Sequence, residues 1–325
     1  MADMVKKATR ESYGEALCEI AERFPNMVVL DADVAAATKT GVFKKKYPER
    51  HFDCGIAEGN MIGVAAGLAA AGKPVFASSF AMFAAGRAFE QIRNSVAYPH
   101  LNVKIAATHA GITVGEDGAT HQCLEDIALM RVLPGMTVIS PADAVEAVAA
   151  LKAALEMTGP CYLRFGRYAV PVLHDPDTYR FEIGKGEVLR DGSDVTIVAN
   201  GILVSMALTA ADTLAAEGIS ARVINIHTVK PLDTELLCAA AAETGAVVTA
   251  EEHNIIGGLG SAVAETLAEN CPVPMVRVGV RDSFGRSGKV PELLALYGLT
   301  PEALCDAARR AVAAKKTGKT ERNGV

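Results

Sequence analysis

The sequence predicts an α/β protein with two domains, each built on a mainly parallel sheet that is flanked by helices. Short apolar runs alternate with longer helical patterns along the chain, as in successive βα units. The alternation stops once, at Pro171 to Pro176, and the chain then stays polar as far as Gly192. Such a stretch is typical of a domain boundary. The predicted units are residues 1–175, a linker at 176–192, residues 193–315 and a flexible tail at 316–325.

The first domain is predicted to begin with a helix and to continue as alternating strands and helices. The apolar run at 27–30 ends in Asp31-Ala32-Asp33, which is typical of a buried parallel strand with acidic residues at its carboxyl end. Pro141 precedes a helical pattern, and Pro is favoured in the first turn of a helix. The predicted strands are 27–30, 74–77, 103–107, 136–139 and 161–164; the predicted helices are 12–23, 62–71, 80–94, 123–131 and 142–156.

A second βα series begins at Asp194 and gives the second domain the same architecture. In parallel sheets of this kind, ligands bind at the carboxyl ends of the strands. The sequence therefore predicts a binding site near Asp33, Phe80 and His109, which follow three strands of the first domain. The strands of the second domain are predicted at 195–199, 221–226, 247–251 and 274–278, with helices from about residues 203, 233 and 260 and a last helix at 301–314.

The composition argues against several classes of protein. The chain has 325 residues and a net charge of -6, which is unlike a general nucleic-acid binder. Its densest apolar run, at 61–71, is too short to span a membrane, and the start of the chain lacks the apolar core of a signal peptide. The seven cysteines are scattered and form no Cys-x-x-Cys pair, as expected for reduced thiols. We therefore expect a cytoplasmic protein without disulfides, without a metal site of its own, and without nucleic-acid or membrane partners.

A single carboxylate, Glu58, stands at the start of a Gly/Ala-rich helical pattern, in the stretch Phe-Asp-Cys-Gly-Ile-Ala-Glu-Gly-Asn-Met at 52–61. It can complement the helix dipole there, or it can act as a general acid or base with a shifted pKa. Phe80 and Phe83 leave a similar choice open. Aromatic residues at this spacing usually belong to the core, but they can also form a wall that stacks on a flat heterocycle.

The loop at 108–122 concentrates chemically active side chains. It holds the imidazoles of His109 and His121 and the carboxylates of Glu116 and Asp117, and its glycines let the backbone approach a ligand. Imidazoles exchange protons near neutral pH and donate to anionic oxygen, so these residue types suit a polar ligand. The alternative is an acidic surface loop with incidental histidines.

Arginines in the first domain are candidates for binding an anion or for structural ion pairs. Arg167 follows a glycine at the end of a predicted strand, where a guanidinium can clamp a phosphate. The same two roles remain open for Arg10, Arg87 and Arg164.

Together these segments resemble the carboxyl-terminal half of transketolase, in which a pyrimidine-binding domain is followed by the transketolase C-terminal domain. The resemblance covers nearly the whole chain, from about Arg10 to Ala314, and Gly-Glu-Asp-Gly-x-Thr-His-Gln combined with the Glu58 motif is specific for it. The chain looks like the second subunit of a split transketolase. The segments that carry the resemblance are 31–33, 55–61, Phe80 with Phe83, 108–122, 140–143 and 248–258.

The resemblance implies thiamine diphosphate as the cofactor. Glu58 would hydrogen-bond the pyrimidine ring nitrogen and favour its imino tautomer, and a site of low dielectric that raises its pKa would help it to donate the proton. Phe80 and Phe83 would pack on the aminopyrimidine. Asp33 would lie at the dimer-facing edge of the cofactor site. Glu58 and His121 would carry the chemistry, with His121 near the reacting carbons.

The resemblance also implies a reaction of carbohydrate metabolism, as in the pentose phosphate pathway: transfer of a two-carbon ketol unit from a ketose phosphate to an aldose phosphate. Asp117 would hold a substrate hydroxyl, and His109, Arg10 and Arg167 would meet the sugar and its terminal phosphate. The family usually has a Ser or Thr after the position of Asp33, where this chain reads Val-Ala-Ala-Ala. Gly86 replaces a further aromatic residue. Both differences concern substrate identity, which the sequence leaves open.

One element of the family is missing from the sequence: a Gly-Asp-Gly followed by a spaced Asn, which holds Mg2+ and the diphosphate. A divalent ion on a diphosphate needs hard oxygen ligands, and no other set is evident. We therefore expect a partner subunit, similar to the amino-terminal half of transketolase, to supply the Gly-Asp-Gly and Asn element and with it the Mg2+ site. Two copies of each chain would form an α2β2 heterotetramer with the active site at the interface.

Three alternatives share parts of this pattern. The β subunit of a 2-oxo-acid dehydrogenase has the same architecture and a cofactor Glu, but the loop at 108–122 is rich in partners for sugar hydroxyls. A deoxyxylulose-phosphate synthase is normally one long chain. A non-catalytic partner subunit would not need Glu58, Asp117, His109 and His121 together.

Overall fold

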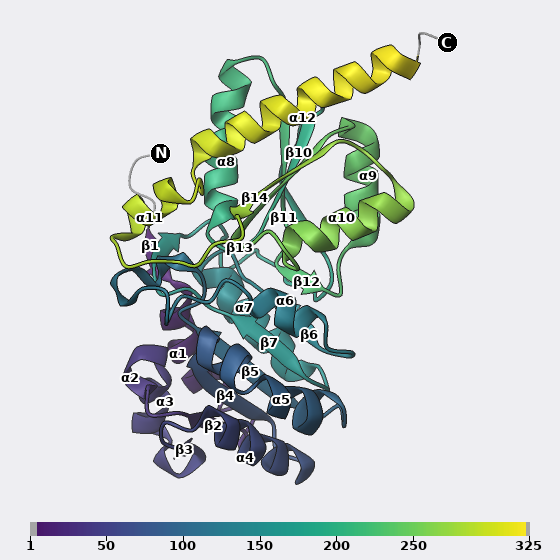
Figure 1. The fold of residues 1–325 in the computed structure, drawn as a ribbon. Coiled ribbons are helices and arrows are strands. Elements are labelled where there is room, and N and C mark those ends of the chain that lie inside the picture. The colour runs from purple at the N-terminus through teal and green to yellow at the C-terminus, as the bar shows by residue number, and fades with distance from the viewer. Residues whose placement is uncertain (1–4, 323–325) are drawn as a thin grey trace.

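The computed structural model describes residues 5–322 and contains two α/β domains stacked end to end (Figure 1). The first domain is built on a seven-stranded sheet with the order β12-β6-β7-β5-β4-β2-β3. Neighbouring strands pair in parallel except β12, which pairs antiparallel with β6. The strands are β2 (Val28–Asp31), β3 (His51–Asp53), β4 (Val75–Phe80), β5 (Val103–Thr108), β6 (Thr137–Ile139), β7 (Cys161–Arg164) and β12 (Thr228–Lys230), and β1 (Lys6–Ala8) and β8 (Ala169–Pro171) form a separate antiparallel pair.

Helices cover both faces of this sheet, so its apolar strands are buried on each side. On one face, Tyr13 and Phe43 pack with Phe76 of the sheet. On the other, the small side chains Ala65 and Ala69 let a Gly/Ala-rich helix lie close to the strands. The helices of this domain are α1 (Thr9–Ile20), α2 (Ala35–Thr38), α3 (Thr40–Lys46), η1 (Pro48–Arg50), α4 (Glu58–Ala70), η2 (Met82–Arg87), α5 (Phe89–Gln91), η3 (Ile92–Ala97), η4 (Ile112–Asp117), α6 (Asp126–Arg131) and α7 (Ala144–Glu156).

The second domain has a five-stranded sheet with the order β14-β13-β10-β11-β9, in which only β9 is antiparallel to its neighbour. One face is covered by α8 and α12, and the other by α9 and α10. Its strands are β9 (Glu187–Arg190), β10 (Val195–Ala199), β11 (Ala221–Asn225), β13 (Val247–Asn254) and β14 (Met275–Val280); its helices are α8 (Leu203–Ala216), α9 (Thr234–Thr244), α10 (Leu259–Asn270), α11 (Val290–Leu296) and α12 (Pro301–Arg322).

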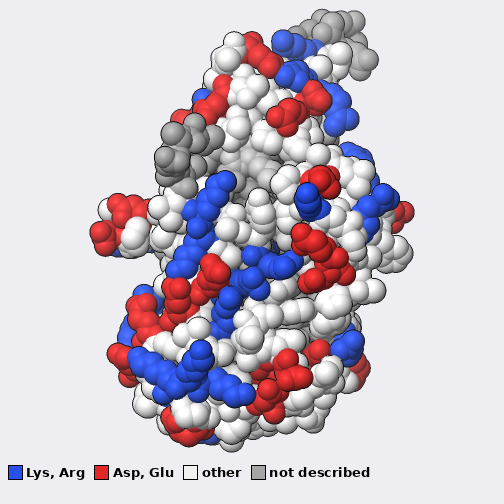
Figure 2. All heavy atoms as spheres, turned by 90° about the vertical axis from the view of Figure 1, so that its left-hand side faces the viewer, with Lys and Arg blue, Asp and Glu red and all other residues white. Residues whose placement is uncertain are grey.

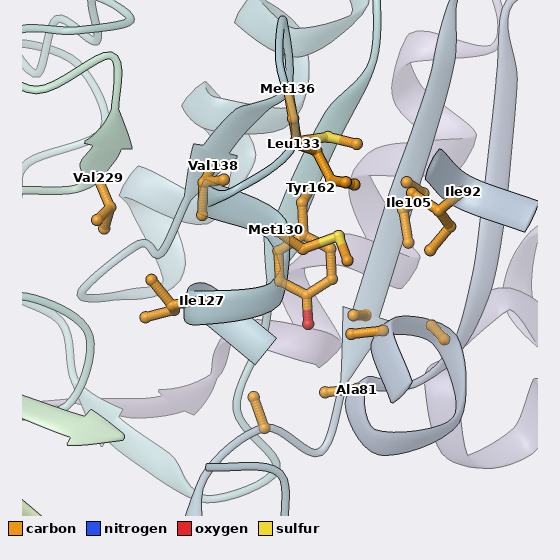
Figure 3. Packing of buried hydrophobic residues seen from close by; sticks show 14 of the residues in the cluster. Ala81, Ile92, Ile105, Ile127, Met130, Leu133, Met136, Val138, Tyr162 and Val229 are labelled. Carbon is orange, nitrogen blue, oxygen red and sulfur yellow. The ribbon is translucent and has the colours of Figure 1, made fainter. Parts of the chain in front are cut away.

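The apolar core is continuous across the two domains. Ile127 and Val138 of the first domain belong to the same buried cluster as Val229, which β12 brings from the second half of the chain. Figure 3 shows Val229 on the side of Val138 and Ile127 that faces away from Tyr162. The sheet of the first domain is therefore completed by a strand that lies beyond its own sequence.

The structure confirms the predicted fold class. Individual elements differ from the prediction where pairing between strands outweighs the helical pattern of the local sequence. Phe80 was expected to begin a helix, but it ends β4 because it pairs with Thr108 of β5. The segment after it is broken into two π-helical turns, η2 and η3, on either side of α5. The helix expected from residue 123 begins at Asp126, because Cys123 bridges to Ala110 and Gly111 in extended conformation.

Two predicted segments outside the domains also contain regular structure. The linker at 176–192 includes β9, which joins the second sheet as an edge strand. The segment expected to be a flexible tail is helical as far as Arg322, and residues 323–325 lie outside the described part of the chain. The boundaries assigned to the two domains stay predictions.

Charges of both signs are interspersed on the face shown in Figure 2, with a group of Lys and Arg side chains across the middle of the molecule. No helix among residues 5–322 combines the length and apolar character needed to cross a bilayer.

Candidate active site

The carboxyl ends of four parallel strands meet at one edge of the first sheet. The pairs Asp31 with Ser78, Phe80 with Thr108, and Ala107 with Arg164 lie at or next to these ends. The residues that follow them therefore come from distant parts of the sequence to one place, which is where open parallel sheets bind ligands.

Glu58 is the first residue of α4, and its side chain is 3% exposed. Arg87, the last residue of the π-helical turn η2, donates from Nη1 to Glu58 Oε2 at 2.7 Å. The Arg87 guanidinium lies 4.7 Å from the centre of the Phe83 ring. A buried carboxylate is thus stabilised by a charged hydrogen bond and by the amino end of a helix. Arg87 thereby links the Glu58 carboxylate to the Phe83 ring.

Four rings form a wall next to Glu58. Phe80 is stacked with Phe83, with ring centres 5.8 Å apart, and with His109 at 3.9 Å. The edge of His121 meets Phe83 at 5.3 Å. Phe80 is buried but Phe83 is only half-buried, so the wall is more than core and presents an aromatic surface that a flat heterocycle can pack on.

His109 is buried, and its backbone has the left-handed conformation with φ 58°. Its Nε2 lies 3.1 Å from Arg10 Nη1, which can only donate, so Nε2 accepts and Nδ1 carries the proton shared with Thr108 Oγ1 at 2.8 Å. Burial, with Arg10 and Arg167 nearby, lowers the pKa of His109 to about 3. Burial and the neighbouring cations thus favour the neutral imidazole, so we expect His109 not to exchange protons near neutral pH.

Cationic groups converge beside His109. Arg10 also donates to the Ala37 carbonyl at 2.9 Å, and burial together with Arg167 lowers the pKa of Arg10. Arg167 donates to the Val114 carbonyl and lies 3.5 Å from Glu116. Like charges held this close, at a partly buried position, suit a site that receives an anion.

Two predicted residues of the loop 108–122, the active-site loop from here on, lie nearer to solvent. His121 is half-buried, and its Nδ1 lies 2.9 Å from Thr120 Oγ1. Asp117 is exposed at the end of η4. Both therefore stay open to a ligand from outside.

Asp33, another predicted site residue, lies apart from this group. It is exposed, and its backbone N–H donates to Asp53 Oδ1 at 3.0 Å. Among the described residues no hydrogen bond or ring contact connects it with Glu58 or with the ring wall. The hydroxyls of Thr38 and Thr40 in the following segment both donate to buried Asp31 at 2.8 Å, so they point into the protein. These two hydroxyls therefore do not replace the Ser or Thr that the family usually has after the position of Asp33.

Two further arginines, Arg164 and Arg87, lie at this edge of the sheet and form ion pairs with carboxylates. Arg164, one of the open candidates, is buried in an ion pair with Asp126 at 2.8 Å and packs the two domains together. The contact between Arg87 and Glu58 was not predicted from the sequence. No local pattern predicts it, because the two residues lie 29 positions apart in the sequence.

The residues present suit one end of thiamine diphosphate. A buried carboxylate that Arg87 links to a ring wall fits a protonatable, flat aminopyrimidine, and within residues 5–322 the one hydrogen-bond partner of Glu58 Oε2 is Arg87. The diphosphate and Mg2+ need a set of hard oxygen ligands. In the described part of the chain, one group brings together at least three potential ligands, Glu146, His174 and Glu187, and none of these is a residue of the site above.

The comparisons with known proteins agree with this geometry. Residues 5–172 match the family described as transketolase, pyrimidine binding domain, and residues 184–304 match transketolase, C-terminal domain. A protein of Methanocaldococcus jannaschii described as a transketolase C-terminal section is 52% identical over 302 residues, covering 92% of this chain and 95% of that protein. A 6-deoxy-6-sulfo-D-fructose transketolase subunit of Clostridium sp. is 49% identical over 299 residues, covering 92% of both.

A solved structure titled as a split gene transketolase, in an inactive beta4 tetramer, has the same fold. It superposes with a TM-score of 0.87 at 56% identity and covers 95% of this chain and 99% of that chain.

Proposed function

Because this chain belongs to the transketolase family and comprises its pyrimidine-binding and C-terminal domains, we propose that it is the pyrimidine-binding subunit of a two-chain transketolase. The enzyme would move a two-carbon ketol unit from a ketose to an aldose that both carry a terminal anionic group. The observation that carries this proposal is the buried carboxylate of Glu58, which Arg87 links to the rings of Phe83, Phe80 and His121.

Thiamine diphosphate, when bound, supplies the nucleophilic carbon that attacks a ketose carbonyl. Glu58 holds a proton at the pyrimidine ring nitrogen, so it sets the tautomer of that ring. Phe80 and Phe83 hold the ring in place and exclude water from it. His121 lies at the open side of the wall, where it exchanges protons with substrate oxygens.

The active-site loop and the cations orient the sugar. Asp117, exposed at the end of η4, accepts a hydrogen bond from a substrate hydroxyl. His109 is neutral with its Nδ1 protonated, so it positions Arg10 rather than adding a charge. Arg10 and Arg167 bind the terminal anion, and their mutual repulsion is relieved when that anion arrives.

We propose that a second subunit completes the site with the Mg2+ and diphosphate ligands. Two observations support this: the described residues near Glu58 bring no cluster of hard oxygen ligands together, and the similar beta4 tetramer is titled inactive. Asp33, which is exposed and separate from the ring wall, would face that subunit in an α2β2 assembly.

The test is to mix this chain with a chain of the amino-terminal half type that carries the Gly-Asp-Gly and Asn element, and to add Mg2+ and thiamine diphosphate. The donors and acceptors should include ketose phosphates, a 6-deoxy-6-sulfo ketose and aldose phosphates, since a relative is named for a sulfonated sugar. Ketol transfer by the mixture, with none by either chain alone, supports the proposal. Transfer by this chain alone, or acyl transfer from 2-oxo acids by the mixture, would overturn it.

A further inference from the structure

The active-site loop rests on the second domain. Ile112 and Leu124 belong to the buried cluster that is formed mainly by the second domain, together with Val290 of α11. The backbone N–H of Thr113 donates to the carboxylate of Glu252 on β13 at 2.7 Å. The loop therefore takes its shape from a domain that contributes none of the predicted site residues.

Gln122 is the side chain that joins the two parts. It is 3% exposed, and its Nε2 lies 3.1 Å from the Ile112 carbonyl, 3.3 Å from the Gly115 carbonyl and 2.9 Å from the Arg286 carbonyl. Carbonyl oxygens only accept, so the amide nitrogen must face them and its orientation is fixed. Gln122 thus links the first residue of η4, Gly115 within η4 and one point of the second domain through a single group.

Residues 285–288 of the second domain lie directly against Gln122 and Gly118. A Cβ at Gly285 would lie 1.8 Å from Gln122 Oε1. On the other side, a Cβ at Gly118 would lie 2.4 Å from Ser287 Oγ. At Gly285 an added Cβ would meet the buried side chain of Gln122, and at Gly118 the φ of 76° disfavours any other residue, so the two surfaces touch where glycine is favoured.

We infer that Gln122 is a positioning residue, and that residues 285–288 form the surface on which it fixes the active-site loop. The inference rests on the proposed function, because it concerns the placement of His121 and Asp117 in that reaction. Gln122 is next to His121 in sequence, so a shift of its side chain moves the backbone of His121. Misplacement of a reacting group by about 1 Å costs on the order of 100-fold in rate.

The first experiment measures the loop itself, without reference to activity. Hydrogen exchange of residues 112–122 is compared in the unsubstituted full chain, in Gly285→Ala and in Gln122→Ala, with Ser283→Ala as the control in the same exposed segment. We expect exchange in the loop to rise about tenfold or more in the first two variants, as for the loss of a buried hydrogen bond, and to stay unchanged in the control. Unchanged loop exchange in both variants would overturn the inference.

The second experiment uses the complex with the partner subunit and a double-mutant cycle. Each single variant should lower kcat about 10- to 100-fold with little change in the KM for thiamine diphosphate. The double variant should be no worse than Gln122→Ala, because the added methyl group no longer meets Oε1. Multiplied losses in the double variant would show that the contact is not the cause.

The two experiments separate the two claims. If the complex of the unsubstituted chain transfers no ketol unit, the proposed function fails, and the exchange measurement still decides whether Gln122 fixes the loop. A variant that does not fold would lose protection throughout the chain. In that case the variant that still folds decides the inference, since Gln122→Ala changes the first domain and Gly285→Ala changes the second.

Discussion

At the scale of single residues, the site places two buried ionisable groups, Glu58 and His109, next to arginines. Glu58 has a cation at 2.7 Å, and His109 has an arginine at 3.1 Å. For His109, burial and this neighbour favour the neutral imidazole, since a charge inside a protein acts strongly on a group that water does not reach. The roles of these residues stay predictions, each with its own test.

Glu58→Gln should lower kcat of the reconstituted complex by about 100-fold or more, because the amide cannot transfer a proton to a ring nitrogen. The shape of the side chain is kept, so the KM values should change little. The matched control is Glu22→Gln, at an exposed position that pairs only with Lys46. Steady-state kinetics checks both, and a Glu58→Gln complex with near-normal kcat would contradict a role for Glu58 in proton transfer.

The His109 ring should stay neutral over the pH range from about 5 to 8, because burial and the cations Arg10 and Arg167 lower its pKa to about 3. NMR of labelled histidine follows the ring directly. In Arg10→Met, loss of one cation should move the pKa of His109 upward, whereas Lys6→Met on the surface should leave it unchanged. A His109 signal that titrates near neutral pH in the unsubstituted chain would refute this.

At the scale of elements, the site depends on how closely helices approach one another and the strands. Gly14 of α1 faces the turn that contains Lys39: an added Cβ would lie 2.5 Å from Lys39 Cβ and 2.6 Å from its carbonyl oxygen. Arg10, one turn earlier on α1, holds the same turn through the Ala37 carbonyl. The entry to the anion site is therefore shaped by the packing of α1.

Gly14→Ala should lower the free energy of unfolding by about 1–3 kcal/mol, as expected for overpacking against backbone. Gly67 on α4 is the matched control, because a Cβ there meets no atom within 4 Å. Gly67→Ala should raise the free energy of unfolding by about 0.5–1 kcal/mol, through better helix propensity. Urea denaturation of the two variants checks the difference, and equal effects would refute the close approach.

Five strands of the first domain were predictable because each is a buried apolar run, as at 27–30 and 103–107. Strand β3 was not predicted, because it has three residues and two of them are exposed. The segment after β4 was not, because its aromatic spacing resembles a regular helix. There the backbone N–H of Ala88 bonds to the Phe83 carbonyl, five residues back. Such a π-helical turn rotates the side chains that follow it, and no spacing rule for an α-helix anticipates the result.

The site itself was predictable where residue types are unusual, as for Glu58 and for His109 with His121. It was not predictable where a contact depends on three dimensions. Arg87 reaches Glu58 across 29 residues of sequence, and Gln122 reaches Arg286 across 164. Nothing in the local pattern around Gln122 distinguishes it from a polar surface residue.

At the scale of the whole molecule, a buried polar network joins the domains. His174 lies between Asp143 and Glu187, with 2.9 Å from each ring nitrogen to a carboxylate oxygen. Asn225 of β11 donates to Glu146 of α7 at 2.8 Å. A cavity of about 490 Å3 borders His174 and Glu187, so this junction is polar and partly accessible.

This network predicts that stability falls as the pH rises. Burial alone would lower the pKa of His174, but the hydrogen bonds with Asp143 and Glu187 outweigh it and raise the pKa to about 10. A group whose pKa is raised on folding stabilises the folded state below its unfolded pKa and loses that effect as pH passes the folded pKa. Burial raises the pKa of Glu146 to about 7, which acts in the same direction at lower pH.

Denaturation midpoints should therefore decline between pH of about 6.5 and 10, and His174→Gln should flatten that decline. The control is His100→Gln, at an exposed position outside the network. Midpoints that decline equally in both variants would show that His174 is not the group responsible.

Strand β12 also limits how the two halves of this chain can be inherited or exchanged separately. It follows β9, β10 and β11 of the second sheet in the sequence, yet it forms the edge of the sheet that carries the candidate site. A chimera that takes its second half from a relative also takes β12 from that relative. This strand must pair with β6 of the first half and carry a side chain that packs as Val229 does with Val138. A crossover in the linker at 176–192 would respect the sequence boundary and still mix two halves of one sheet. Natural recombination and engineering alike should favour exchanges that keep β6 and β12 from the same parent.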